Sequence, residues 1–436
     1  MEESLRGAVA ARRAEMIGWT RAMIRVPTLN PPGEHYREIC ELIAGWLAPM
    51  GFDCRFIRAE GTPGDSARYP RWNLLARREG ARPGPTVHFN GHIDVVEVGH
   101  GWTHDPFGGD LVGGRVYGRG ACDMKGGIAA ALAAVAALLE VCPDLPGAIE
   151  VSATADEETG GYGGVAYLAE RGVFSRVDHV IIPEPLNKDR VCLGHRGVWW
   201  AELETLGRIA HGSMPFLGDC AARHMGAVLA EMEESLYPTL AARRTAMPVV
   251  PPAARASTLN INSIHGGQAE PEPGFDGLPS PVVPDSCRMV IDRRFLAEEE
   301  LGAVKAEFRE TVERARARRP FDYRLRDVLE VLPSMADREG PVVRALSGAV
   351  REVLGRDPDY VVSPGTYDQK HIDRIGKLRD CVAYGPGILD LAHQPDEYVE
   401  VEDMLDSALV MALALERLLR PGLEAGGGDR GPGEGA

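Results

Sequence analysis

The sequence has no paired cysteine motif, no long apolar run and no excess of positive charge. Its eight cysteines are scattered along 436 residues without a Cys-x-x-Cys pair, as expected for reduced thiols rather than a disulfide framework. No apolar run approaches the roughly 20 residues needed to cross a bilayer, and the first 25 residues lack the apolar core of a signal peptide. The formal net charge of −16 disfavours nucleic acid and anionic membranes as partners. We therefore expect a cytoplasmic protein with no nucleic-acid or membrane partner.

The chain is longer than one comfortable hydrophobic core, so two domains are expected. In the first half, short apolar runs alternate with amphipathic helical patterns, which predicts a mostly parallel sheet flanked by helices. From residue 197 the runs alternate apolar with polar side chains, which is typical of antiparallel sheets. After residue 318 the first pattern resumes. The second domain is therefore predicted to be an insertion in the first.

We predict an α/β fold with the following boundaries. The first domain is discontinuous, covers residues 1–196 and 316–421, and has a mixed, mostly parallel sheet flanked by helices. The inserted domain, residues 197–315, is α+β with an antiparallel sheet. Residues 266–284 are rich in proline and glycine and are expected to form a long functional or mobile loop. The glycine-rich tail, residues 422–436, is expected to be disordered.

A histidine and an aspartate lie at the end of a predicted buried strand, residues 86–92. The carboxyl ends of such strands carry the sites of α/β proteins. His92 and Asp94 are two residues apart, so their side chains point to the same side of an extended chain. One could bind a divalent metal while the other fixes the imidazole. An isolated His-x-Asp pair is more often a satisfied core histidine beside a helix-capping aspartate, so this motif alone does not indicate a metal site.

Asp123 lies in a glycine-rich segment, residues 118–127, directly before a predicted helix. Glycines allow backbone conformations closed to other residues and a close approach to a ligand. Asp123 could cap the helix, bind a metal, or do both. A glycine-rich turn before a helix can also bind phosphate, but the dinucleotide spacing Gly-x-Gly-x-x-Gly is not met in its usual context, directly after the first strand. Phosphate binding is therefore the weaker interpretation.

Three consecutive acids, Asp156, Glu157 and Glu158, follow another predicted strand. Inside a sheet protein they are costly unless a cation neutralises them, whereas at the surface they would form a solvated turn. Next to a metal, one glutamate could be a ligand and the other a general base. Glu184 ends a further strand, and His393 lies in a loop near the carboxyl end. Taken individually, neither residue indicates a site.

Together, these five motifs resemble those of one metal-dependent family that contains aminoacylases, acetylornithine deacetylases, succinyl-diaminopimelate desuccinylases and glutamate-releasing carboxypeptidases. The motifs are residues 91–94, 118–126, 156–158, 183–185 and 393–397. The resemblance covers nearly the whole chain, residues 16–419. It implies an amide-cleaving enzyme with a small-molecule substrate, two divalent metal ions per chain and a homodimeric assembly.

The resemblance assigns a role to each motif. It identifies five residues as metal ligands, namely His92, Asp123, Glu158, Glu184 and His393. Asp123 would bridge two metals. His92 and Glu184 would complete the first site. Glu158 and His393 would complete the second. Asp94 would orient His92, and Glu157 would be the base that activates a metal-bound water. The metals are expected to be zinc, with cobalt and manganese as alternatives.

The inserted domain resembles the family's lid and dimerisation domain. In relatives, the histidine matching His211 reaches the partner subunit's active site and helps to stabilise the oxyanion; the alternative is a strand-end histidine on a polar face. Arg294, and the turn with Gly365 and Thr366, match positions where relatives hold a substrate carboxylate. For Arg294, the alternative is a surface salt bridge.

Departures from the family pattern concern the substrate rather than the metal ligands. Residues 280–284 stand where relatives often carry an asparagine, Pro183 stands where glycine is common, and Tyr367 enlarges a position near the substrate turn. We predict a dinuclear metal-dependent hydrolase that cleaves an amide bond of an N-acyl amino acid, of the deacetylase or desuccinylase type. The alternatives are an exopeptidase of the same family and an inactive metal-binding scaffold. The presence of Glu157 argues against the scaffold.

Overall fold

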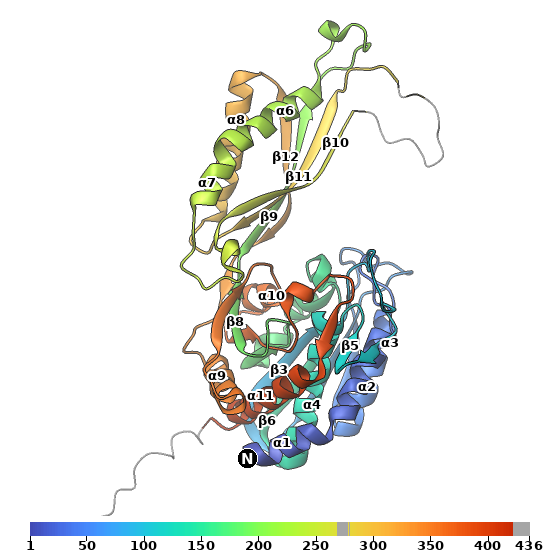
Figure 1. The fold of residues 1–436 in the computed structure, drawn as a ribbon, viewed down its shortest axis with the longest axis vertical. Coiled ribbons are helices and arrows are strands. Elements are labelled where there is room, and N and C mark those ends of the chain that lie inside the picture. Colours follow the sequence, from blue (N-terminus) through green and yellow to red (C-terminus); the bar gives the residue numbers. More distant parts are fainter. Residues whose placement is uncertain (268–277, 279, 422–436) are drawn as a thin grey trace, which may run out of the picture. The chain divides into compact units, whose positions relative to one another are not determined.

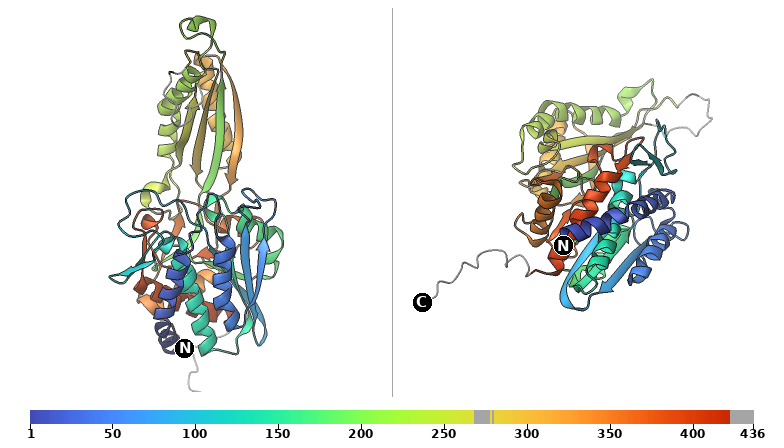
Figure 2. Two further views of the ribbon diagram at one scale, coloured as in Figure 1. Left: turned by 90° about the vertical axis from the view of Figure 1, so that its right-hand side faces the viewer. Right: turned by 60° about the horizontal axis from the view of Figure 1, so that its bottom comes forward.

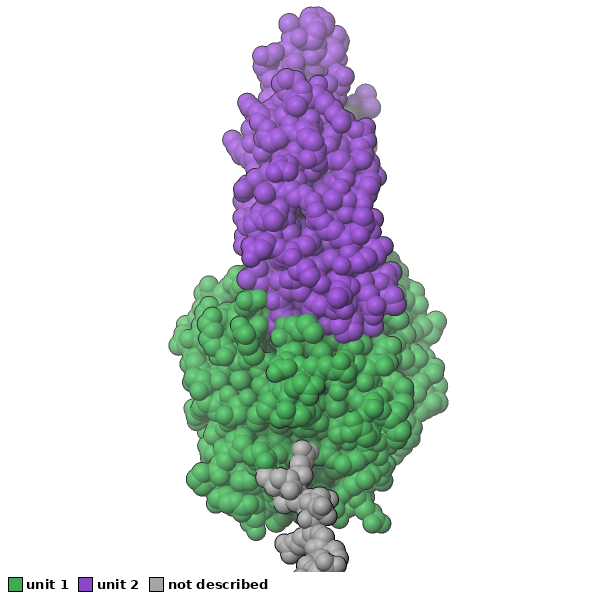
Figure 3. All heavy atoms as spheres, turned by 90° about the vertical axis from the view of Figure 1, so that its left-hand side faces the viewer, with its two compact units in different colours: residues 1–194, 335–361, 367–436 green, residues 195–334, 362–366 purple. Residues whose placement is uncertain are grey.

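The computed structural model describes residues 1–267, 278 and 280–421. The predicted tail and most of the predicted long loop lie outside the described residues. The chain divides into two compact units, which have different colours in Figure 3. The first unit contains Met1–Gly194, Met335–Val361 and Tyr367–Ala436, and the second contains His195–Ser334 and Val362–Thr366.

In the described part of the chain, the first unit is built around a nine-stranded mixed sheet (Figures 1 and 2). The strands are β1 (Asp53–Arg58), β2 (Trp72–Glu79), β3 (Arg82–His92), β6 (Pro146–Thr154), β7 (His179–Ile182), β8 (Arg190–His195), β13 (Ser334–Met335), β14 (Asp359–Ser363) and β15 (Cys381–Ala383). In space they run in the order β1-β2-β6-β3-β7-β15-β8-β13, and β14 pairs with β8. The central pairs β6–β3, β3–β7 and β7–β15 are parallel, whereas β1–β2 and β2–β6 are antiparallel.

Helices cover this sheet and complete the core of the first unit. They are α1 (Glu2–Ala11), α2 (Arg13–Ile24), α3 (Tyr36–Leu47), α4 (Gly126–Val141), α5 (Tyr167–Glu170), α9 (Pro341–Leu354), α10 (Gln369–Arg374) and α11 (Val401–Leu419). α4 and α11 pack against each other and against β3. Because neighbours surround α4, almost all of its residues are buried, and its sequence is apolar on every face. β6 is likewise buried along its whole length, as expected for a strand covered on both sides.

One helical stretch, Ala121–Val141, is long and apolar enough to cross a membrane by length and composition alone, although Asp123 and Lys125 interrupt it in the sequence. In the structure, 83% of its apolar window is buried inside the protein. A core helix has the same composition, so this stretch is weak evidence for a membrane span. The cytoplasmic location stays a prediction.

A small antiparallel sheet joins distant segments of the first unit. It contains β4 (Asp110–Val112), β5 (Arg115–Tyr117) and β16 (Tyr398–Glu400), in the order β16-β5-β4. β16 therefore brings the carboxyl-terminal part of the chain beside the segment that leads to Asp123.

The second unit has an antiparallel sheet covered by helices (Figure 1). Its strands are β9 (Gly197–Leu206), β10 (Thr258–Gly266), β11 (Ser286–Phe295) and β12 (Asp322–Val331), and its helices are α6 (Ala221–Glu231), α7 (Tyr237–Ala242) and α8 (Leu301–Arg318). The strand order is β10-β11-β9-β12. α6 packs on β9, β11 and α8. Buried and half-buried residues alternate along β9, because one face of the sheet packs on the helices and the other does not. The predicted α/β fold with an antiparallel α+β insertion is confirmed.

The division into units differs from the predicted boundaries at the end of the insertion. The prediction ended the inserted domain at residue 315, but β12 pairs with β9 along its whole length, so the second unit continues to Ser334. β12 is an edge strand, and most of its residues are exposed. Its polar side chains, among them Arg324 and Arg326, weaken the apolar pattern by which a strand is predicted from sequence. Polar and charged side chains are common on edge strands.

Candidate metal centre

Five acid and histidine side chains meet at one edge of the large sheet. His92 is the last residue of β3, Glu158 follows β6, and Glu184 follows β7. Since these strands are parallel, their carboxyl ends lie at the same edge. Asp123 lies in the segment before α4, and His393 lies in the loop before β16. Every one of the predicted metal ligands is therefore delivered to this edge by a strand end or by a segment packed against it.

The five side chains form two groups that share one member. The first group is His92, Asp123 and Glu184, and the second is Asp123, Glu158 and His393; within each, the candidate ligand atoms lie within 4.8 Å of one another. His92 Nε2 is 3.0 Å from Asp123 Oδ1. His393 Nε2 is 3.1 Å from Glu158 Oε1 and 3.5 Å from Asp123 Oδ2. The two carboxylate oxygens of Asp123 thus face different groups, as a bridging ligand requires.

The approach of α4 to this edge depends on a glycine. A Cβ atom on Gly127 would lie 1.9 Å from the carbonyl oxygen of Pro183, far closer than two such atoms can come. Only glycine therefore allows the start of α4, which follows Asp123, to pack against the strand end that carries Glu184.

The buried charges of the two ligand groups favour a bound cation. Burial and the negative charge of Asp123 raise the pKa of Glu158, against the opposing hydrogen bond to His393, to about 7. Burial, together with the charge of Asp123, also raises the pKa of Glu184 well above its usual value. Hydrogen bonds to Asp123 and Glu158 raise the pKa of His393 to about 10. Protons on these side chains thus supply counter-charge in the metal-free site, and a divalent ion can replace them. Imidazole and carboxylate are ligands that zinc, cobalt and manganese accept, so this set fits such an ion.

Asp94 supports the site through its backbone and its side chain. Its carbonyl oxygen lies 3.1 Å from His92 Nδ1, whereas its carboxylate is 3.6 Å from the same nitrogen. The carboxylate instead accepts the backbone N–H groups of Glu157 and Glu158, each at 3.1 Å, and the side-chain amide of Asn30 at 2.9 Å. Asp94 therefore holds the acidic loop as well as the imidazole.

Glu397 fixes the segment that carries Asp123. Its buried carboxylate accepts the backbone N–H groups of Cys122 and Asp123, at 2.9 and 3.0 Å, and forms a 2.6 Å ion pair with Arg119. Glu397 belongs to a motif quoted above, but no role was assigned to it from the sequence.

Glu157 does not take part in either ligand group. Its Oε1 atom accepts a 2.6 Å hydrogen bond from the ammonium group of Lys370, which lies in α10. Sequence reasoning missed Lys370, because it stands outside the five motifs.

A family model described as Peptidase family M20/M25/M40 matches residues 88–417, which include all five candidate ligands. The chain belongs to this family. The family resemblance predicted from the motifs is thereby confirmed, and the M20 protein is a metal-dependent hydrolase that acts on C–N amide bonds.

The M20 protein is similar to curated desuccinylases over most of its length. The succinyl-diaminopimelate desuccinylase of Thioalkalivibrio sulfidiphilus is 30% identical over 389 residues, which cover 87% of this chain and 93% of the relative. The enzyme of the same name from Azoarcus sp. is 31% identical over 397 residues, which cover 88% and 92%.

Solved structures of other M20 proteins share the fold. Human carnosine dipeptidase 1 has a TM-score of 0.76 and 20% identity, with 96% of this chain and 99% of that chain covered. The M20 metallo-carboxypeptidase Sso-CP2 of Sulfolobus solfataricus has a TM-score of 0.73 and 19% identity, with 93% and 99% covered. A Bacillus subtilis protein described as a dinuclear metal binding M20 peptidase has a TM-score of 0.66 and 16% identity, with 94% and 99% covered.

The remaining predicted site residues of the M20 protein belong to the second unit. His211 is exposed, and its Nδ1 atom accepts hydrogen bonds from the backbone and hydroxyl groups of Ser213, at 3.1 and 2.8 Å. Arg294 forms a two-point ion pair with Asp292, at 2.7 and 2.8 Å, which is the salt-bridge alternative noted above. Gly365 donates its N–H to Ser363, and Thr366 follows it. The roles of these residues stay predictions.

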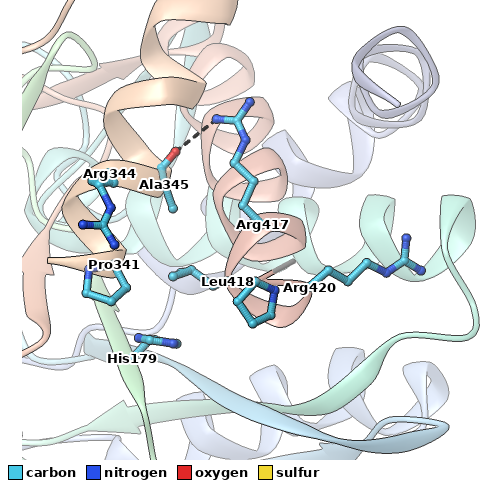
Figure 4. A pocket seen from close by; sticks show the side chains of 8 residues that line it. His179, Pro341, Arg344, Ala345, Arg417, Leu418 and Arg420 are labelled. Carbon is cyan, nitrogen blue, oxygen red and sulfur yellow. Dashed lines mark hydrogen bonds between the residues drawn. The ribbon is translucent and has the colours of Figure 1, made fainter. Parts of the chain in front are cut away.

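A cavity of about 190 Å³ lies between α9 and α11 of the M20 protein (Figure 4), and none of the candidate metal ligands lines it. Arg344, Arg417 and Arg420 line it, but their guanidinium groups point in different directions in Figure 4. Arg417 also pairs with Glu352, and Arg420 with Glu416. The arginines therefore do not concentrate positive charge on one point, and the cavity does not resemble an anion site.

Proposed function

We propose that this M20 protein is a dinuclear deacylase that cleaves the amide bond of an N-acyl amino acid, with a succinyl or acetyl group as the acyl part. The observation that carries the proposal is the sharing of Asp123 between two ligand groups. The names of the curated relatives support the acyl class. These relatives are named desuccinylases, and the similarity covers most of their length.

The ligand set would hold two divalent ions, zinc by preference and cobalt or manganese as alternatives. His92 and Glu184 would complete the first site. Glu158 and His393 would complete the second, with Asp123 common to both. When bound, such ions supply positive charge that polarises the scissile carbonyl and acidifies a nearby water.

Glu157 is proposed as the general base. Glu157 directly precedes the ligand Glu158, and its charge acts on the ligand Glu184, so its carboxylate would reach a water at the ligand groups. It would take a proton from the attacking water and later deliver a proton to the departing amine. Asp94 would act as a positioning residue, because it holds both His92 and the backbone of Glu157.

The second unit is proposed to act as lid and dimerisation domain. In a homodimer, His211 of the partner subunit would donate a hydrogen bond to the oxyanion that forms during attack. Arg294 and the turn of Gly365 and Thr366 would hold the substrate carboxylate. For Arg294, this requires the substrate to replace Asp292 as its partner.

An exopeptidase, either a dipeptidase or a carboxypeptidase, is the second candidate. Deacylation and exopeptidase cleavage break the same kind of C–N bond and differ in the groups that flank it. The family description and the names of the similar structures favour this alternative as much as the curated relatives favour a deacylase.

A side-by-side substrate panel tests the proposal. The purified protein, loaded with zinc, cobalt or manganese, is assayed on N-acetyl and N-succinyl derivatives of the same amino acids and on dipeptides. Preference for acyl amino acids supports the deacylase, and preference for dipeptides supports the exopeptidase. A protein that binds the metals but hydrolyses none of the panel would be a scaffold, and the proposal would be wrong.

A further inference from the structure

We propose that Lys370 is a positioning residue for the base, which fixes the carboxylate of Glu157 in the orientation that proton transfer requires. The inference rests on the proposed role of Glu157 and deepens it. It assigns a function to a residue outside the motifs on which the metal site was predicted.

The contact between the two side chains is short and buried. Lys370 Nζ lies 2.6 Å from Glu157 Oε1, and the side chains are only 2% and 10% exposed. A buried ammonium group is costly unless it is paired, so this geometry is strongly preferred once the protein has folded. Burial alone would lower the pKa of Lys370, but the charges of Glu157 and Asp368 outweigh it and raise the pKa above its usual value. Lys370 therefore remains a cation.

The negative charge of Asp368 also attracts Lys370. Its Oδ2 atom accepts hydrogen bonds from the amide of Asn90 at 2.7 Å and from the hydroxyl of Thr154 at 3.2 Å. Asn90 and Thr154 lie on the paired strands β3 and β6, which also end at the metal ligands. The negative charge that attracts Lys370 is thus anchored to the sheet, not to a loop.

α10 holds the acidic loop at a second point. His371, the next residue, lies with Nε2 2.7 Å from the carbonyl oxygen of Gly160, three residues after Glu157. One turn of helix therefore binds the side chain of Glu157 and the backbone that follows it. Two attachments fix the loop more firmly than one, because rotation about a single contact is prevented.

The ion pair leaves one oxygen of the base available. Lys370 bonds to Oε1 only, and Oε2 of Glu157 makes no hydrogen bond within the described residues. A glutamate side chain has three rotatable bonds, and loss of its only side-chain partner would let the carboxylate sample several orientations. Because proton transfer requires a heavy-atom distance of about 2.6–3.2 Å, misplacement by about 1 Å costs on the order of 100-fold in rate.

Lysine substitutions with a matched control test the inference. Lys370→Met removes the charge while keeping the length of the side chain, and Lys370→Arg keeps the charge. Lys305→Met is the control, because Lys305 pairs with Asp327 and Glu330 in the second unit, whereas the candidate metal ligands belong to the first. For each variant, kcat and KM are measured on N-acetyl and N-succinyl substrates of one amino acid, together with bound zinc and the thermal midpoint.

We expect Lys370→Met to lower kcat about 100-fold on both substrates, with KM and bound zinc unchanged. Lys370→Arg should recover part of the loss, and Lys305→Met should retain wild-type kinetics. A rise in KM confined to the succinyl substrate would overturn the inference, because Lys370 would then bind the substrate carboxylate. Loss of zinc together with kcat, without recovery in Lys370→Arg, would also overturn it in favour of a purely structural role.

Crystal structures of the wild type and Lys370→Met separate this inference from the proposed function. If the wild type hydrolyses no substrate of the panel, the proposed function fails, yet the orientation of Glu157 is still observable. A reoriented or multiply placed Glu157 side chain in Lys370→Met supports positioning by Lys370. The same single orientation in both structures overturns it.

Discussion

One carboxylate oxygen of Asp94 accepts the backbone N–H of Glu158 at 3.1 Å. The other accepts the N–H of Glu157 at the same distance. Asp94 therefore binds the first turn of the short helix Glu157–Thr159, where free backbone N–H groups favour a negative charge. Since its carbonyl also contacts His92, one residue links both ligand groups and the base.

Asp94→Ala should weaken metal binding because it releases the backbone of the acidic loop that carries Glu158, although the carbonyl of residue 94 can still contact His92. Loss of a residue that orients metal ligands typically lowers affinity by about 10–100-fold. Titration of the metal-free variant with zinc against a competing chelator measures the change. Wild-type affinity in Asp94→Ala would show that the loop keeps its conformation without this carboxylate.

Glu157→Gln should abolish most turnover while leaving metal content intact. Removal of a general base costs about 100- to 10,000-fold in rate, and Glu157 belongs to neither ligand group. Steady-state kinetics and elemental analysis of the purified variant give both quantities. If the variant instead loses bound metal, Glu157 is a ligand and its assignment as the base is wrong.

His211→Ala should lower kcat by about 100- to 1,000-fold, the usual cost of one oxyanion donor. Metal content should not change, because His211 lies in the second unit and the ligands lie in the first. Kinetics of the variant are compared with those of Ser213→Ala, which removes only the hydroxyl partner of His211. Wild-type rates in His211→Ala would remove this residue from the site.

His371 should make the metal-free protein less stable in mild acid. Burial, together with the charge of Lys370, lowers the pKa of His371 to about 4, against the opposing hydrogen bond to Gly160. Its folded pKa is thus below the unfolded value of about 6.5, so the unfolded chain takes up the proton first. The contribution of neutral His371 to the free energy of unfolding is therefore complete above about pH 6.5 and is lost as the pH falls towards about 4.

Urea unfolding of the wild type and His371→Gln measures this contribution. Between about pH 7 and about pH 4.5, the free energy of unfolding of the wild type should fall by up to about 3 kcal/mol more than that of the variant. Glutamine can keep the hydrogen bond to Gly160 but does not titrate, which makes it the matched control. Equal losses in both proteins would show that His371 is protonated in the folded state as well.

The candidate metal ligands could be named because five motifs together carry a family signature, although Glu184 and His393 taken singly indicate no site. His92 and Glu184 end apolar strands, and Asp123 follows glycines that precede an alanine-rich helix. Parallel strands bring their carboxyl ends together, so residues distant in sequence could be expected at one edge.

The contacts that support the ligands have no such signature. Lys370 lies in a six-residue helix and binds a glutamate 213 positions earlier in the chain. A lysine after an aspartate and a glutamine looks like a solvated surface residue, and only the folded structure shows that it is buried. β12 was missed for a related reason, because its mostly polar side chains give a weak strand pattern.

His393 and α11 lie late in the chain, which bears on when the proposed metal centre would be complete. α11 packs against α4, and β16 pairs with β5, so the last described segment completes the core that the first half begins. A nascent chain that ends inside the second unit would present Asp123, Glu158 and Glu184 without the second imidazole. With the proposed ligand set, stable metal binding would follow synthesis of nearly the whole polypeptide, and a chain that ended earlier would lack the imidazole of His393.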